Sequence, residues 1–280
     1  MLARLLLRSV PKMRERRRAF QVLAIVLFSF ASTSCGRTIT IAGPIDASAT
    51  STVETQGPSN VVVDSLGGDA VAAITLADVI HRRRISVTAM GVCASSCAQY
   101  VFAASPHRRV ARGSLLLFRD TATAMKAIVS DDSDQTVRTL FDARSRRELS
   151  LYATLGIDSR LLLLPLVQVR TVCYEVLRTP DNRVADIRFR ASKMGWATSK
   201  DELERMGFRF AGALPRRSVD FYRAAAWKLA VDAGRVAFSE QVPLQSFSEM
   251  QRALTQIPRC DRVDGALLSP GGTVSWLAGE

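Results

Sequence analysis

Histidine is almost absent from this chain, which contains only His81 and His107 among its 280 residues. Histidine is the side chain that most often takes the proton of a serine nucleophile, and it is a common zinc ligand. His81 ends an apolar helical run and His107 precedes a strand, so neither is expected near the serine-rich segment at residues 91–98. The scarcity excludes a histidine-rich metal site and leaves a serine-based site without an evident base.

Aromatic residues are also scarce, at 7% of the chain, although the formal net charge is +12. Proteins that bind single-stranded nucleic acid interleave aromatic and basic side chains, and the sequence has no such stripe. Half of the excess charge lies in residues 1–35, which carry seven basic side chains against Glu15. The rest occurs in short clusters such as residues 82–84, typical of solvated helix ends. Nucleic acid is therefore not expected as a partner.

The N-terminus lacks an apolar run of full membrane-spanning length, because residues 19–31 are about 13 in number. They follow a basic segment and precede small residues, the pattern of a secretory signal. We therefore expect residues 1–35 to be a signal peptide or a membrane anchor. Cleavage near residues 31–34, lipidation of Cys35 and an uncleaved anchor remain open. Each outcome predicts a bacterial secreted protein, periplasmic or anchored in the membrane and facing the periplasm.

Cysteine is limited to five residues, and four of them lie beyond Cys35: Cys93, Cys97, Cys173 and Cys260. An oxidising compartment favours disulfides, and four cysteines allow three pairings. Among these, Cys93 with Cys97 is the close pair and Cys173 with Cys260 the long-range one. A single C-x3-C without a second pair or a nearby histidine lacks zinc-site spacing, so no metal or other cofactor is expected.

Short apolar runs alternate with helical patterns over the first half of the chain. Four runs are expected strands: residues 38–42, 61–63, 85–90 and 114–118. The fully apolar run at 61–63 is typical of a buried parallel strand. Between the strands, one helix is expected after Asp69 or the glycine before it, and another from Ser95 to about Ala104. This rhythm predicts an α/β fold of repeated β-α units with a parallel sheet.

Helical patterns dominate the second half, and no internal repeat is present. Three helices are expected there, at residues 133–155, 199–206 and 219–232. The apolar segment at 161–176 is interrupted by Pro165, and the tail beyond residue 232 is weakly patterned. These helices are expected to be additions at the C-terminal side of the sheet-forming region.

Two motifs about thirty residues apart carry the chemistry. Asp64-Ser65-Leu66-Gly67-Gly68-Asp69 offers glycine amides at a strand-to-helix turn, and Gly91-Val92-Cys93-Ala94-Ser95-Ser96-Cys97-Ala98 offers a serine at the start of the next helix. Amide donors beside a hydroxyl are the parts of an acyl-transfer site, an oxyanion hole and a nucleophile. The same serine also suits a helix N-cap, the commoner use of serine in this position.

These residues resemble the Clp peptidase and crotonase superfamily, and within it the periplasmic Clp-protease-like proteins. The segment 64–69 is similar to the family's S-P-G-G loop, with Leu66 in place of proline. The segment 91–98 resembles its serine elbow in a C-A-S-S-C-A form, and 196–208 resembles a late helix and turn of the family. The similarity covers about a third of the chain together with this late segment.

The resemblance implies a role for each matched residue. Ser95 corresponds to the nucleophile, and the backbone amides of Gly68 and Ser96 correspond to the oxyanion hole. A ClpP/crotonase-like domain would span residues 36–214, and residues 215–280 would form a C-terminal helical extension. The family commonly assembles into trimers, hexamers or heptamer rings, so a homo-oligomer is implied, with a peptide or protein as ligand.

The family's histidine has no counterpart here. At the end of the strand after the serine helix, Phe118 or Arg119 takes its place, depending on register. Arginine is permanently protonated and cannot accept the serine proton. Asp120 can pair with Arg119 or serve as a weak base, because a carboxylate near arginine has a lowered pKa. Lys126, in the expected loop after this strand, is the best lysine candidate for a dyad, ahead of Lys193.

Three hypotheses follow from these residues. In the first, an extracytoplasmic Clp-protease-like protein has lost hydrolytic power and keeps the Ser95/Gly68 groove for binding. In the second, Ser95 works as an active serine peptidase with a base such as Lys126. A crotonase-type acyl-thioester enzyme is the third, and an extracytoplasmic location deprives it of coenzyme A thioesters. The first hypothesis is preferred over the second because the base is missing.

Overall fold

A mainly parallel sheet forms the centre of the chain. The computed structural model describes residues 36–229, 235–242 and 245–262. In the described part, a six-stranded sheet has the order β1-β2-β3-β4-β9, and β5 pairs with the carboxyl half of β3. The strands are β1 (Thr38–Ala42), β2 (Asn60–Ser65), β3 (Ser86–Ala94), β4 (Arg108–Val110), β5 (Leu115–Leu117) and β9 (Ala211–Gly212). All of these pairings are parallel, which confirms the predicted α/β class.

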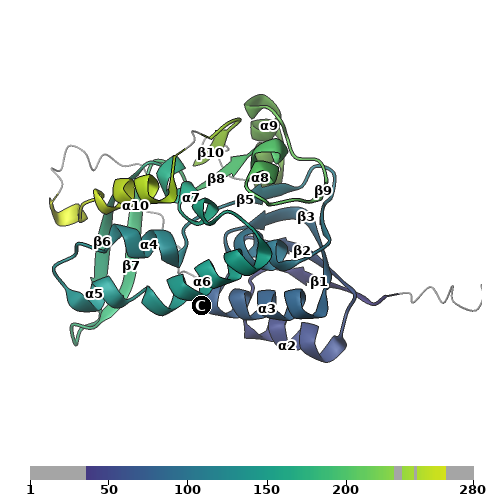
Figure 1. Ribbon diagram of the computed structural model, residues 1–280, viewed down its shortest axis with the longest axis horizontal. Coiled ribbons are helices and arrows are strands. Elements are labelled where there is room, and N and C mark those ends of the chain that lie inside the picture. Colours follow the sequence, from purple (N-terminus) through teal and green to yellow (C-terminus); the bar gives the residue numbers. More distant parts are fainter. Residues whose placement is uncertain (1–35, 230–234, 243–244, 263–280) are drawn as a thin grey trace, which may run out of the picture. The chain divides into compact units, whose positions relative to one another are not determined.

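Helices cover one face of this sheet (Figure 1). They are α2 (Ala47–Gln56), α3 (Ala70–Arg83) and the π-helix η1 (Cys97–Phe102). Asp69 caps α3 as expected, because its carboxylate accepts the amide of Ala72 at 2.6 Å. Alternate strand residues such as Val61 and Val87 are fully buried in the same core as Ile74 of α3. On the opposite face, side chains of β1, β2 and the first half of β3, Thr40 among them, are exposed or half-buried. At the end of β3 and in β5 that face is covered, because Val92 and Leu115 are buried in a second cluster with Phe221.

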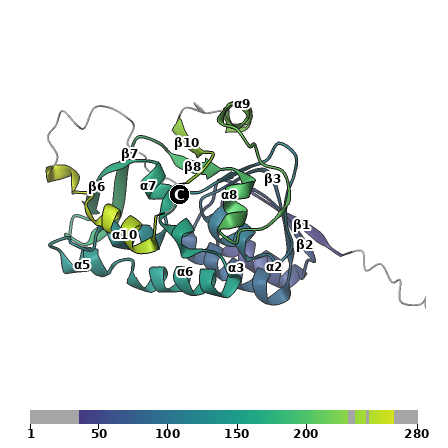
Figure 2. The ribbon, with the colours of Figure 1, turned by 45° about the horizontal axis from the view of Figure 1, so that its top comes forward.

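Two smaller sheets complete the fold (Figures 1 and 2). β6 (Thr171–Arg178) and β7 (Val184–Ala191) form an antiparallel hairpin. β8 (Gly195–Thr198) and β10 (Val236–Ser239) pair in parallel. Phe118, just after β5, exchanges backbone hydrogen bonds of 2.7 and 2.8 Å with Trp196 and so joins β8 to the end of β5. The hairpin over the 171–191 region was not predicted.

The remaining helices surround these sheets. They are α4 (Ala122–Ile128), α5 (Gln135–Thr139), α6 (Asp142–Leu155), η2 (Ser159–Leu162), α7 (Leu164–Gln168), α8 (Lys200–Arg205), α9 (Ser218–Leu229), α10 (Phe247–Thr255) and η4 (Cys260–Arg262). The single helix expected at 133–155 was wrong, because the chain forms α5 and α6 there. Val137 and Phe141 are buried but Leu140 is 44% exposed, so the apolar positions do not form one stripe.

The C-terminal region belongs to the same compact unit as the sheet. The described residues from Arg37 onward form one unit. The expected boundary at 214/215 falls inside it, where β10 of the extension pairs with β8, so the extension holds a strand as well as helices. The expected signal or anchor at 1–35 lies outside the described residues, as do 230–234 and 263–280. None of the helices in the described ranges is long and apolar enough to cross a bilayer.

A buried carboxylate joins three helices. Glu148 of α6 is fully buried and accepts hydrogen bonds from the Tyr100 hydroxyl of η1 at 2.5 Å and from the amides of Ala122 and Thr123 at 2.8 and 2.7 Å. The Thr123 hydroxyl adds a fourth bond at 2.6 Å. Burial raises the pKa of Glu148, and these donors act in the opposite direction. The carboxylate therefore fixes the start of α4 against η1, the helix that follows Ser95.

Tyr100→Phe removes one donor from this buried carboxylate while three remain. We expect it to lower the free energy of unfolding by about 1–3 kcal/mol, because the lost bond is buried and involves an ionisable acceptor. Tyr222→Phe is the matched control, since the Tyr222 hydroxyl makes no hydrogen bond in the described structure, and it should change stability by less than about 0.5 kcal/mol. Urea denaturation of both variants measures the difference. Equal effects would show that Glu148 does not depend on Tyr100.

A disulfide between Cys173 of β6 and Cys260 of η4 closes a long loop, with a sequence separation of 87. Nearby, the Tyr174 hydroxyl donates to the buried Asp132 at 2.6 Å. The disulfide thus ties the C-terminal segment to the hairpin. The entropy of closing so long a loop predicts a large effect on stability.

Cys173→Ser/Cys260→Ser should destabilise the fold by about 4–5 kcal/mol, against about 2 kcal/mol for Cys93→Ser/Cys97→Ser, whose loop is far shorter. Thermal unfolding of the two double variants, both without reductant, compares them directly. A larger loss of stability in the Cys93/Cys97 variant would mean that the short disulfide also stabilises the folded state, beyond reducing the conformational entropy of the unfolded chain.

Candidate functional site

Ser95 occupies a strained turn directly after β3. Its φ of +52° lies in the left-handed region, which residues other than glycine rarely adopt. Its amide donates to the carbonyl of Leu117 at 2.9 Å, and its carbonyl accepts the amide of Gln99 at 2.9 Å as η1 begins. The side chain is half-buried. Strain of this kind is found where the surrounding structure holds a residue for function, as at the serine of a nucleophile elbow.

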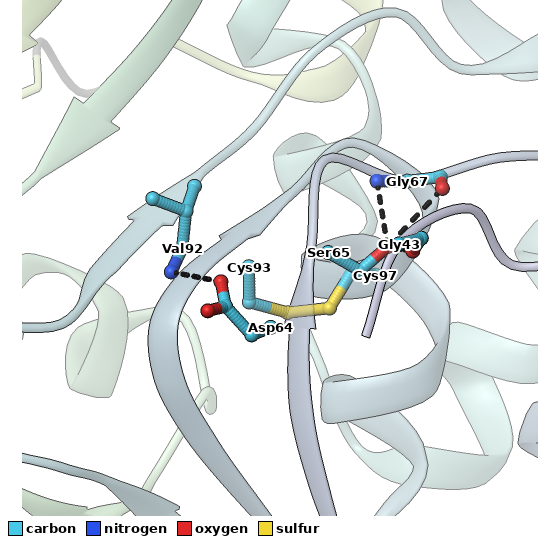
Figure 3. Close-up of a disulfide and its surroundings, with 7 residues drawn as sticks. All are labelled: Gly43, Asp64, Ser65, Gly67, Val92, Cys93 and Cys97. Carbon is cyan, nitrogen blue, oxygen red and sulfur yellow. Dashed lines mark hydrogen bonds between the residues drawn. A yellow bond between two sulfur atoms is a disulfide. The ribbon is translucent and has the colours of Figure 1, made fainter. Parts of the chain in front are cut away.

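A short disulfide spans this turn. Cys93 in β3 and Cys97 at the start of η1 are joined, and both are fully buried (Figure 3). The bond links the residues on either side of Ser95 through a closed loop of five residues. The end of the strand and the start of the helix are therefore fixed to each other covalently, and the turn between them has little freedom.

The glycine loop lies against the serine turn. Gly67 has a φ of +108°, and a Cβ at this position would lie 2.9 Å from the Cβ of Ser95. The next residue, Gly68, pairs with Ile45, whose carbonyl oxygen would lie 2.2 Å from a Cβ at Gly68. The Ser96 hydroxyl donates to the Gly68 carbonyl at 3.4 Å. The two sequence motifs are thus in direct contact, and both glycines are required by close approach.

Two backbone amides beside Ser95 have no acceptor within the described structure. They belong to Gly68 and Ser96, the residues that the resemblance assigns to the oxyanion hole. The amides around them are used: Asp69 donates to Ile45 at 2.8 Å and Gly67 donates to the Ser65 hydroxyl at 3.1 Å. Backbone amides without an acceptor in the protein can donate to the carbonyl oxygen or oxyanion of a ligand.

Side chains beneath the glycine loop hold it in place (Figure 3). Ser65 accepts the Gly67 amide and donates to the Gly43 carbonyl at 2.5 Å. The Asp64 carboxylate accepts the amide of Val92 at 2.9 Å. These bonds connect the turn after β1, the loop after β2 and the bulged end of β3, so the support of the site comes from three neighbouring strands.

Both histidines lie at the other edge of the sheet. His81 is in the last turn of α3, roughly 18 Å along the helix from its N-cap Asp69 beside Gly68. His107 precedes β4, whose Arg108 pairs with Val87 near the start of β3. Ser95 lies eight residues further along that strand, roughly 25 Å away. Neither histidine is therefore placed to act on Ser95.

Phe118 and Arg119, the residues that the resemblance aligns with a histidine, have different surroundings in the structure. Phe118 is fully buried, with ring centroids 5.8 Å from Trp196 and 5.6 Å from Phe208. Arg119 packs along Gly195, and its guanidinium lies 3.8 Å from Asp120. Burial lowers the pKa of Arg119 to about 9, while Asp120 acts in the opposite direction. Arg119 thus remains a cation at neutral pH.

The two lysine candidates differ in their surroundings. Lys126 lies on α4 rather than in a loop, and its ammonium is 2.7 Å from the carboxylate of Asp142. This ion pair lowers the pKa of Asp142. Lys193 borders a small cleft that Arg119 and Asp120 also line. The structure gives no contact between Ser95 and either lysine among the described residues.

Sequence reasoning missed two residues that shape the site. Gly67, rather than Gly68, makes the direct approach to Ser95, and Glu148 anchors the helices behind it. The signal for Glu148 was available, because it lies on the apolar face of its helix with Phe141 and Tyr152 at spacings of seven and four. An acidic residue on such a face is seldom buried without partners.

No model of a protein family matches the sequence, and no curated protein matches it. Among solved structures, a mutant of ClpP1 from Listeria monocytogenes is similar at 17% identity and a TM-score of 0.34, covering 43% of this chain and 72% of that one. A mutant of the membrane-bound stomatin-specific protease 1510-N is similar at 18% identity and a TM-score of 0.25, covering 30% and 47%. At these scores neither structure carries an argument about function.

The described residues also contain no group of three or more histidine, cysteine or acidic side chains arranged to hold a metal ion. The groups that the candidate site offers to a ligand are the Ser95 hydroxyl and the amides of Gly68 and Ser96.

Gly67→Ala tests the contact between the two motifs. Its Cβ would collide with Ser95, so we expect a loss of stability of about 1–3 kcal/mol beyond that of Gly113→Ala. Gly113 is the matched control, since it also has a positive φ, +75°, and a Cβ there meets nothing within 4 Å. Urea denaturation measures both. Equal losses would mean that Gly67 does not press against the serine turn.

Proposed function

We propose that this chain is an extracytoplasmic Clp-protease-like protein that binds a peptide or protein ligand at the Ser95/Gly68 site and is hydrolytically impaired. The observation that supports this most is the contact of the glycine loop with the strained serine turn, with both histidines at the far edge of the sheet. The arrangement offers a hydroxyl and two amide donors to a carbonyl, and in the described part of the chain no histidine or lysine contacts that hydroxyl.

The chemistry of such a site favours binding. The amides of Gly68 and Ser96 donate to a carbonyl oxygen of an extended peptide, and the Ser95 hydroxyl can add a third hydrogen bond. Without a general base the hydroxyl is a weak nucleophile, and loss of that base reduces the rate by about 10²–10⁴-fold or more, since the members of a triad act as a unit. Arg119, which follows β5, is a cation and cannot accept the serine proton, so it cannot substitute for the base.

An extracytoplasmic location is part of the proposal. It is supported by the basic and apolar pattern of residues 1–35 and by two disulfides, which persist in oxidising compartments. Self-assembly into a homo-oligomer stays a prediction from the resemblance, and light scattering of the purified chain measures it.

The second candidate is an active serine peptidase that uses Lys126. It is favoured by the position of α4, the helix that carries Lys126. This helix begins two residues after Asp120 and follows β5, which pairs with the end of β3 just before Ser95. In this alternative Lys126 has to leave Asp142 and lose its proton. A carboxylate at 2.7 Å stabilises the charged ammonium, which argues against that step.

A fluorophosphonate probe distinguishes the two candidates. We expect the full-length chain to label no more than Ser95→Ala, because an unactivated serine reacts slowly with the probe. Lys126→Ala and Lys200→Ala are added as a pair, since Lys200 is another ion-paired lysine, 3.6 Å from Glu204. Labelling that Ser95→Ala and Lys126→Ala abolish, and Lys200→Ala retains, would establish the peptidase instead.

Fluorescein-labelled casein serves as an unfolded peptide probe for binding, followed by fluorescence polarisation. The wild type should bind it, and Gly67→Ala should weaken binding at least tenfold, whereas Gly113→Ala should leave it unchanged. Casein binding that is equal in all three proteins would place the ligand elsewhere on the chain.

A further inference from the structure

A second polar surface lies at the edge where the parallel strands begin, opposite the edge that carries Ser95. A shallow groove of about 780 Å³ occupies this amino edge, between the first residues of β2, β3 and β4 and the segment before β9. Hydroxyl and amide side chains form its floor, from Asn60, Ser86 and Thr88. Because Thr88 pairs with Arg109 across β3 and β4, this arginine extends the same row of side chains.

The walls of the groove are cationic. Arg109, Arg209 and His107 are exposed, and their side chains form no ion pair within the described structure. The one acidic residue that lines the groove, Glu204, has its carboxylate 3.6 Å from Lys200. The guanidinium groups of Arg109 and Arg209 are therefore available to an anionic partner. The negative charge of Glu204 is partly neutralised by Lys200.

Arg108 fixes the shape of the groove. Its guanidinium donates to the carbonyl of Ala103 at 2.9 and 2.5 Å and to the carbonyl of Arg209 at 3.1 Å. It also lies 5.3 Å from the centre of the Phe208 ring. These contacts hold the segment of Arg209 against the start of β4, so the free guanidinium groups are presented by a fixed backbone.

The positive charge continues along the same edge. α3 runs back to it and ends in the exposed residues 82–84, all arginine. Arg37, exposed at the start of β1, accepts the amide of Ser59 at 2.9 Å through its carbonyl and so adjoins the groove. Glu54 and Asp78 adjoin the arginine run, and each accepts from it only through its backbone carbonyl, Glu54 from Arg83 and Asp78 from Arg82. The carboxylate of Asp78 pairs instead with Arg147.

We propose that this basic edge, defined by Arg37, residues 82–84, His107, Arg109 and Arg209, docks on an anionic phospholipid surface. The occupant follows from the chain itself, because the segment of residues 1–36, with its basic and apolar runs, joins the compact unit at Arg37. A membrane-directed segment therefore leaves from the edge that carries the free arginines. An apolar anchor combined with a basic patch gives stable membrane attachment where one of them alone is marginal.

Docking in this way has a consequence for the proposed ligand site. Ser95 lies roughly 25 Å along β3 from the basic edge, at the carboxyl ends of the strands. The ligand site would face away from the headgroups and stay open to a peptide. The surface proposed here is thus separate from that site, and each can fail without the other.

The test uses the full-length chain and co-sedimentation with vesicles. Vesicles of phosphatidylglycerol and phosphatidylcholine in equal parts are compared with pure phosphatidylcholine. The test variant is Arg109→Glu/Arg209→Glu, and the matched control is Arg223→Glu/Arg252→Glu, which changes the charge equally on α9 and α10. All four arginines are exposed, and equal thermal unfolding confirms that the variants fold.

A basic side chain near an anionic surface contributes roughly fivefold in affinity, so reversal at positions 109 and 209 should weaken anionic-vesicle binding by about 25-fold or more. The control should lose much less, and added salt should weaken wild-type binding. Equal losses in the two double variants, or no loss in the test variant, would overturn the proposal.

Chemical protection gives a second readout that does not depend on how strongly residues 1–35 bind lipid. Phenylglyoxal modifies exposed arginines, and mass spectrometry locates the modified sites. Anionic vesicles should protect Arg109 and Arg209 and leave Arg223 and Arg252 reactive. Equal reactivity at all four sites would overturn the proposal. Tighter binding of poly-L-glutamate than of anionic vesicles at equal charge would assign the edge to an acidic protein, and would overturn it too.

Discussion

The contact between Gly67 and Ser95 is the constraint on which the candidate site depends. A left-handed backbone at a serine is unfavourable alone, and here it is held from three sides: by the Leu117 carbonyl, by the disulfide across the turn and by the glycine loop. The same contact brings Gly68 next to the serine turn, where the Ser96 hydroxyl donates to its carbonyl. A side chain at Gly67 would push these parts away from one another, so the site requires glycine there for steric reasons.

The parallel sheet separates two kinds of chemistry. Because all its strands run the same way, the loops that follow them gather at one edge, with Ser95 and Gly67, and the residues that precede them gather at the other, with Arg109 and His107. Ligand sites of open α/β sheets form at the carboxyl edge. The two histidines lie at the amino edge as a direct result of this topology, so both are distant from Ser95.

Much of the site and part of the fold follow from local sequence. The apolar run at 61–63, the Asp69 cap and the glycine and serine motifs act over a few residues, and the structure has each where the sequence predicts it. The hairpin of β6 and β7 was missed although its pairing is local, with Arg178 opposite Val184 across a short turn, because residues 161–176 were interpreted as one apolar segment interrupted by Pro165. α10 was missed although Ser246 and Glu249 form a capping box and Phe247, Met250 and Leu254 stand at helical spacing, so both of its signals are local. Lys126 was expected in a loop, and its place on α4 depends on the distant Glu148.

The five-residue loop closed by Cys93 and Cys97 bears on how the molecule is made. A ring this small restricts the backbone of Ser95 even in an unfolded chain, so an oxidised precursor begins folding with the unfavourable turn already narrowed to few conformations. A reduced precursor has to reach that turn through packing alone, and burial of both sulfurs then shields them from an oxidant. Oxidation before folding therefore lowers the conformational entropy that the chain loses when it forms the serine turn.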